Sequence, residues 1–214
     1  MSVNPAAGIM AALARLVSGV QVRWVDSEPD PRQAVYFANH SSHLDFVVLW
    51  SSLPAEVRAV TRPVAAQDYW STGLRRALAV NVFRAVLVAR HAAKSEESEA
   101  HDAAADPRLA IEHMLEAMGE TDSLILFPEG TRGTGDEVAR FKSGLYYLAQ
   151  RRSGLRMIPA YLNNLNRILP KGEFLPVPFI SKLTFGPALT LTDGESKPAF
   201  LARTREAVCR LKDL

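Results

Sequence analysis

The residues best suited to catalysis lie between Asn39 and Asp45, in the stretch NHSSHLD. An imidazole acts as a general base when a carboxylate bonds one ring nitrogen and leaves the other free to take a proton. Residues five apart on a regular helix are rotated by about 140° and do not face each other. His40 and Asp45 can therefore meet only if the histidine lies in a turn and the aspartate in the helix that follows. A structural histidine beside a helix-capping aspartate is the alternative interpretation.

A metal site is a second possible use of this stretch, with His40, His43 and Asp45 as ligands. The spacing His-x-x-His-x-Asp is not a specific zinc signature, and a single cysteine offers no sulfur cluster. We therefore expect neither a metal ion nor a cofactor. The same cysteine, Cys209, cannot form an internal disulfide, so nothing indicates an oxidising compartment.

The second stretch with chemical potential runs from Phe127 to Arg132 and reads FPEGTR. A turn of this composition presents backbone N–H groups, a hydroxyl and a guanidinium together, and these are groups that hold a phosphate. An ordinary surface turn with an ion pair is the alternative. A P-loop is excluded, because no Gly-Lys-Ser/Thr occurs in the required frame.

The elements that must position these residues alternate between strands and helices. The predicted strands are residues 20–25, 34–38, 57–61, 85–89, 123–127, 157–162 and 180–185. The predicted helices are residues 46–53, 67–80, 107–118, 141–152 and a last one from about residue 198, with an N-terminal amphipathic helix in residues 1–19. This order predicts an α/β fold with a mostly parallel central sheet flanked by helices.

The polar residues follow the apolar strands, where ligands gather in parallel sheets. His40 follows the strand at 34–38, Arg90 follows the strand at 85–89, and Glu129 and Arg132 follow the strand at 123–127. We therefore expect these residues to share one site.

Chain length, net charge and the lengths of the apolar runs limit the class of protein. The chain has 214 residues and a formal net charge of +2, which suits a single domain over residues 1–214 without a nucleic-acid partner. The sequence shows no signal peptide and no apolar run of about 18–20 residues that would span a membrane. We expect a cytoplasmic protein with peripheral membrane contact, through the N-terminal helix, Trp70 or the loop at 169–178. Residues 91–106 are expected to form a polar loop.

The order of motifs is that of a known family. NHSSHLD, an apolar strand ending in Arg90, FPEGTR, FKSG and Ile158-Pro159 follow one another along the chain. This order resembles the glycerolipid acyltransferase family, which includes the enzymes that acylate 1-acylglycerol-3-phosphate. The resemblance covers roughly Val20 to Leu191 and implies a glycerol-3-phosphate acyltransferase-like fold.

The resemblance also implies roles for residues. It implies that His40 is the general base and Asp45 its orienting partner. The residues that would bind the phosphate of the acceptor or shape its pocket are Arg90, Glu129, Gly130, Thr131 and Arg132. Two positions depart from the family's pattern: no glycine precedes Arg90 in its block, and Gly133 stands where a serine often follows the third block.

The implied reaction moves a fatty acyl group from a thioester to a lysophospholipid hydroxyl, with 1-acylglycerol-3-phosphate giving phosphatidic acid. The implied donor is acyl-CoA or acyl-carrier protein, for which Arg151, Arg152 and Arg156 are candidate contacts. Three alternatives stay open. They are a non-phosphate acceptor such as lyso-ornithine lipid, a non-catalytic lipid- or acyl-carrier-binding module, and a metal-dependent hydrolase.

Overall fold

The computed structural model describes residues 5–42, 44–67, 70, 73–88, 107–133, 137–164 and 181–214. The strands are β1 (Gln21–Trp24), β2 (Ala34–Ala38), β3 (Thr61–Ala66), β4 (Val86–Val88), β5 (Ser123–Leu126), β6 (Arg156–Asn163) and β7 (Lys182–Phe185). The helices are α1 (Pro5–Ser18), α2 (Asp45–Ser52), α3 (Ala55–Ala59), α4 (Gly73–Asn81), α5 (Pro107–Met118), α6 (Gly144–Arg151) and α8 (Lys197–Arg210), and a 3-10 turn, η1 (Leu211–Asp213), follows α8.

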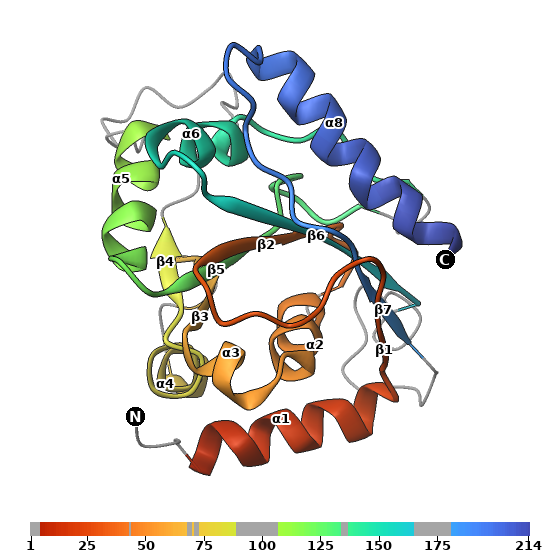
Figure 1. Ribbon diagram of the computed structural model, residues 1–214. Helices are drawn as coiled ribbons and strands as arrows, with labels where there is room; N and C mark the ends of the chain where they lie inside the picture. Colours follow the sequence, from red (N-terminus) through yellow and green to blue (C-terminus); the bar gives the residue numbers. More distant parts are fainter. Residues whose placement is uncertain are drawn as a thin grey trace, which may run out of the picture.

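The seven strands form one sheet in the order β1-β7-β6-β2-β5-β3-β4 (Figure 1). Neighbouring strands are parallel, with the single exception of the antiparallel pair β6 and β7. Strands β1 and β7 therefore run opposite to the other five. The predicted α/β fold with a mostly parallel central sheet is confirmed.

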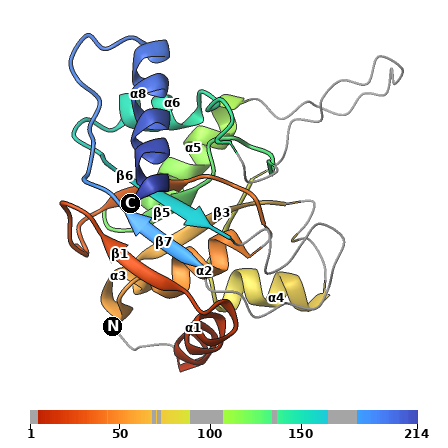
Figure 2. The ribbon, with the colours of Figure 1, turned by 90° about the vertical axis from the view of Figure 1, so that its right-hand side faces the viewer.

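Helices cover both faces of the sheet, and the central strand β2 is buried on both. Its odd-numbered side chains, Val35 and Phe37, pack in the layer of α5, α6 and α8, whereas Ala34, Tyr36 and Ala38 pack in the layer of α1 and α2. Figures 1 and 2 agree that α8 and α1 lie on opposite sides of the sheet. The alternation follows from the two-residue period of a strand.

One predicted strand is wrong. Residues 57–61 were expected to be extended, but residues 55–59 form the short helix α3 and the strand β3 begins at Thr61. Pro54 ends α2 and stands at the N-cap of α3. Within β3, Pro63 is the last residue paired with β5, and Val64 is the first paired with β4. A proline fits this point because it lacks the N–H that a continuous ladder would need.

The N-terminal helix α1 packs against α2. The Arg15 guanidinium donates to the carbonyl oxygens of Ser51 (2.5 Å) and Leu53 (3.2 Å) at the C-terminal end of α2. Its charge is thereby used where a helix leaves carbonyl groups unpaired. Among the helices that the structure describes, none has the length and apolar character needed to cross a bilayer.

Candidate active site

The predicted pair of imidazole and carboxylate forms at the carboxyl end of β2. His40 Nδ1 lies 2.8 Å from Asp45 Oδ2. The same carboxylate oxygen accepts the backbone N–H groups of Ser41 (2.6 Å) and Ser42 (2.8 Å), and the Asp45 side chain is fully buried. Three donors on one oxygen fix the carboxylate, and the first turn of α2 favours its negative charge.

This arrangement shows which ring nitrogen of His40 is engaged and which is left open. With Nδ1–H donated to Asp45, the other nitrogen, Nε2, carries the lone pair. No described residue bonds it, and the His40 side chain is 23% exposed. His40 is thus set up to take a proton from a bound molecule.

The FPEGTR turn and Gly133, the residue after it, bond the N–H and the carbonyl of His40. Glu129 Oε1 accepts the His40 N–H (2.7 Å), and the Gly133 N–H donates to the His40 carbonyl (2.8 Å). Glu129 Oε2 accepts the N–H of Ala139 (2.8 Å), so both carboxylate oxygens of this buried residue are in use. Gly133 makes its bond through the backbone, so this contact does not depend on the serine that the family often has there.

Ring stacking adds a further restraint on the base. The Phe127 ring lies against the imidazole of His40, with centroids 4.5 Å apart and planes 24° from parallel. The sequence motifs assign no role to Phe127. Its position as the last residue of a predicted buried strand, one residue before Pro128, is the signal that it lies at this edge.

A cleft of about 230 Å³ opens beside His40. Its walls are mostly apolar and come from β3, β4, β5 and α2. The residues that line it are His40, Phe46, Val64, Ala65, Ala66, Trp70, Val88, Leu126, Phe127, Gly130 and Arg132. The cleft therefore combines an imidazole, apolar walls and one guanidinium.

The structure brings together most of the predicted site residues. His40, Gly130 and Arg132 line the cleft, while Asp45 and Glu129 support it from behind. Thr131 is exposed on the same turn and is not among the residues that line the cleft. Arg90 and His43 lie outside the described residues, as do the loops at 91–106 and 169–178. No group of three potential metal-ligating side chains occurs within the described part of the chain.

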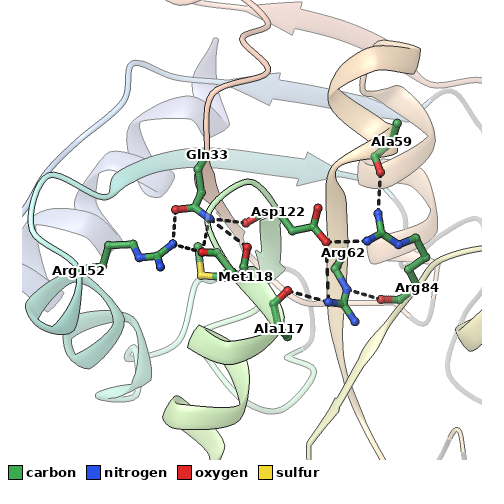
Figure 3. A network of polar contacts seen from close by, with 9 residues as sticks. Gln33, Ala59, Arg62, Arg84, Ala117, Met118, Asp122 and Arg152 are labelled. Atoms are coloured by element: carbon green, nitrogen blue, oxygen red, sulfur yellow. Dashed lines mark hydrogen bonds and ion pairs between the residues drawn. The ribbon is translucent and has the colours of Figure 1, made fainter. Parts of the chain in front are cut away.

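The three arginines considered for the acyl donor lie at the opposite, amino edge of the sheet. Arg152 donates to the Gln33 side chain and to the Gly119 carbonyl (2.6 Å), as Figure 3 shows for Arg152 and Gln33. Arg156, the first residue of β6, pairs with Asp30 at 3.0 Å. Arg151 lies 3.8 Å from Glu112. These cations are far along the strands from His40 and already have partners.

The fold and the site define a class of protein: an α/β domain with a hydrogen-bonded histidine–aspartate pair at the carboxyl edge of its sheet. A family model described as Acyltransferase matches residues 19–163. The 1-acyl-sn-glycerol-3-phosphate acyltransferases of Limnanthes douglasii and Limnanthes alba are each 29% identical over 181 residues, which are 81% of this chain. The match spans 57% of the length of each of these relatives.

A solved structure shows the same fold. The 1-acyl-sn-glycerophosphate (LPA) acyltransferase PlsC from Thermotoga maritima superposes with a TM-score of 0.70 at 18% identity, over 98% of this chain and 78% of that one. The chain belongs to the acyltransferase family. The resemblance to glycerolipid acyltransferases that its motifs carry is confirmed.

Proposed function

We propose that this protein transfers a fatty acyl group from a thioester to the hydroxyl of a lysophospholipid, with 1-acylglycerol-3-phosphate as acceptor and phosphatidic acid as product. The observation that carries the proposal is the 2.8 Å contact between His40 Nδ1 and Asp45 Oδ2, at one end of a cleft with apolar walls and an arginine. The motif order, the family match and the relatives named as acyltransferases of this acceptor support it.

The reaction needs a base and no covalent enzyme intermediate. Nε2 of His40 removes the proton of the acceptor hydroxyl as its oxygen attacks the thioester carbonyl. The carbon–sulfur bond then breaks, the imidazolium returns the proton to the departing sulfur, and the products are an ester and a free thiol. Asp45 holds the ring and stabilises the imidazolium, a role worth several orders of magnitude in comparable triads.

The acceptor phosphate is assigned to the FPEGTR turn. Arg132 lines the cleft with His40, and a guanidinium binds a phosphate with two parallel bonds. Glu129 supports this turn from inside, because both of its oxygens bond backbone N–H groups. The donor is acyl-CoA or acyl-carrier protein, since either presents its acyl group as a thioester.

A panel of substrates tests the proposal. Purified protein is incubated with acyl-CoA or acyl-carrier protein and with lysophosphatidate, lyso-ornithine lipid or other lyso-lipids, and products are identified by mass. We expect phosphatidic acid as the main ester. Ester formation with lyso-ornithine lipid alone would replace the proposed acceptor, and release of free fatty acid without an ester would indicate a hydrolase instead.

We further propose that α1 attaches the protein peripherally to the membrane that holds this acceptor. Ile9, Leu13 and Leu16 follow one another at helical spacing and are 64%, 52% and 79% exposed. The one charged residue of α1, Arg15, is turned to the carbonyls of α2. The outer face of the helix is therefore apolar, as in helices that lie in a membrane interface.

Flotation with anionic vesicles checks this attachment. We expect Leu16→Gln to lower the bound fraction several-fold. Leu109→Gln is the matched control, because Leu109 is 61% exposed on α5, in the other helical layer. Flotation of Leu16→Gln equal to that of the wild type would remove α1 from the membrane contact, and a gradient run without vesicles gives the background.

A further inference from the structure

The second residue of the FKSG segment lies across the FPEGTR turn. A Cβ atom built on Gly130 would be 2.6 Å from Lys142 Nζ, 2.7 Å from Cε and 2.8 Å from Cδ. These separations are shorter than real Cβ contacts, so a larger residue at this position would push the flexible end of the lysine chain aside. Gly130 also has φ +73°, a conformation that glycine adopts without strain. The end of the lysine chain therefore lies directly over the glycine.

The backbone holds Lys142 in this place. Its N–H donates to the carbonyl of Pro128 (2.8 Å), two residues before Gly130. The side chain then runs over Gly130, which lines the cleft together with His40 and Arg132. The ammonium group thus lies close to Gly130, one of the residues that line the cleft, through contacts between segments twelve residues apart.

The charge of Lys142 has no partner among the described residues. The residue is exposed, and no described carboxylate lies within ion-pair distance of its ammonium group. Glu129, the acidic residue of the same turn, uses both oxygens on the N–H groups of His40 and Ala139. A cation beside Gly130, on the turn that carries Arg132, and with no counter-ion among the described residues suits an anionic ligand.

We propose that Lys142 is a second cation, beside Arg132, for the phosphomonoester of the acceptor. This rests on the proposed lysophospholipid acceptor. In 1-acylglycerol-3-phosphate the reacting hydroxyl and the phosphate are on neighbouring carbons, so a hydroxyl bound at His40 brings the phosphate to the nearest cations. Lys142 is a binding residue in this account and takes no part in proton transfer.

Steady-state kinetics give the first test. We expect Lys142→Ala to raise KM for lysophosphatidate about tenfold, which corresponds to about 1.4 kcal/mol, with little change in kcat or in KM for the donor. Lys197→Ala, which removes an exposed lysine from the start of α8, should change none of the three. A rise in the donor KM alone would overturn the assignment to the acceptor.

The glycine provides a second variant. Gly130→Ala should displace the Lys142 chain and raise the same KM by a similar factor. Alanine at φ +73° is strained with or without the lysine, and this strain should lower the melting temperature in both backgrounds. In the Lys142→Ala background the chain is absent, so Gly130→Ala should raise KM by a smaller factor than in the wild type, and such non-additivity in KM is the sign of one shared interaction. Additive effects would show that the two residues act separately. Melting curves of all variants establish that each is folded.

A labelling experiment tests the anion site without the acylation reaction. Wild-type protein is reductively methylated with and without glycerol 3-phosphate, and the modification of each lysine is followed by mass spectrometry. We expect glycerol 3-phosphate, but not glycerol, to slow labelling of Lys142 several-fold and to leave Lys197 unchanged. Equal labelling of Lys142 would overturn the proposal even if lysophosphatidate is acylated. Protection without acylation would leave the anion site standing and reject the proposed acceptor.

Discussion

The two edges of the sheet are both rich in polar side chains, yet they use them differently. At the amino edge, Arg62 donates to the carbonyls of Arg84 (2.8 Å) and Ala117 (2.7 Å), and Arg84 donates to Ala59 (2.9 Å) and to Asp122 (2.7 Å), as drawn in Figure 3. Burial lowers the pKa of Arg62, and the Arg84 guanidinium adds to this, whereas Asp122 opposes it. These groups join strand starts, turns and helix ends.

At the carboxyl edge the hydrogen bonds of two buried carboxylates meet at one residue, His40. Asp45 and Glu129 are buried and fix the side chain and the backbone of His40. Nε2 of His40 and the cations Arg132 and Lys142 have no partner among the described residues. His40 and Arg132 line the cleft, and Lys142 lies over Gly130, which lines it too. The two edges therefore do not differ in being rich in polar groups. They differ because the carboxyl edge has polar groups beside a cleft that no described residue bonds.

Asp45→Asn should have the largest effect of the variants that keep the histidine. An amide can present an N–H to His40 Nδ1, which favours the tautomer with the proton on the wrong nitrogen. We expect kcat to fall by about 10²–10⁴-fold. Initial rates at saturating substrate measure this, and a rate within about threefold of the wild type would break the contrast between the edges at its strongest point.

Arg132→Ala should act on binding. Loss of a charged bond to phosphate predicts a rise in KM for lysophosphatidate of about 10- to 100-fold. The side chain is exposed, so we expect the melting temperature to stay the same. Arg132→Lys retains the charge but cannot make two parallel bonds, so its KM should lie between those of the wild type and Arg132→Ala. A fall in kcat with an unchanged KM would contradict this role.

Arg62→Ala is the counterpart at the amino edge. It removes two bonds to backbone carbonyls, which predicts a loss of about 2 kcal/mol in the free energy of unfolding. For a chain of this size the melting temperature should fall by about 4–8 °C. Calorimetry measures the loss, and kcat and KM should be unaltered in the remaining folded protein. A change in kcat or KM with an unchanged melting temperature would contradict this structural role of Arg62.

The smallest expected effect is a pH dependence. A hydrogen bond from Arg32 lowers the pKa of Asp30 to about 2, and Arg156 adds to the shift. Because this value is below the usual one of about 3.9, the carboxylate stabilises the fold above pH 4, and the contribution is lost as the pH falls toward 2. Asp30→Asn should remove this part of the acid dependence. Urea unfolding midpoints of the wild type and of Asp30→Asn are measured as the pH falls from 7 toward 2. An equal fall in midpoint for the two proteins would refute the prediction.

The sequence predicted the elements whose apolar runs are continuous. Residues 34–38 and 123–126 are strands buried by helices on both faces, and each ends at a motif. The pairing of His40 with Asp45 was also predictable, because only a turn followed by a helix brings residues five apart together. The predicted strand at 57–61 was wrong because Val57 is the one buried residue of a five-residue helix. So short a pattern does not separate the period of a helix from that of a strand.

Other features depend on contacts between distant segments. The sequence placed Glu129 at the site, but its two backbone donors are 89 and 10 residues away. Arg152 is a free cation in the sequence, yet it bonds Gln33, 119 residues away. The passage of Lys142 over Gly130 needs the two turns side by side. No local periodicity carries these contacts, so the structure was required to show them.

The central claim is that His40 is the base. The most direct measurement is the rate of acyl transfer to lysophosphatidate by His40→Ala at saturating substrate, with its melting temperature recorded beside that of the wild type. The account predicts a rate about 10²–10⁴-fold lower in a protein that stays folded, with no acylated protein detected by mass. Transfer at the wild-type rate by the folded variant would contradict it.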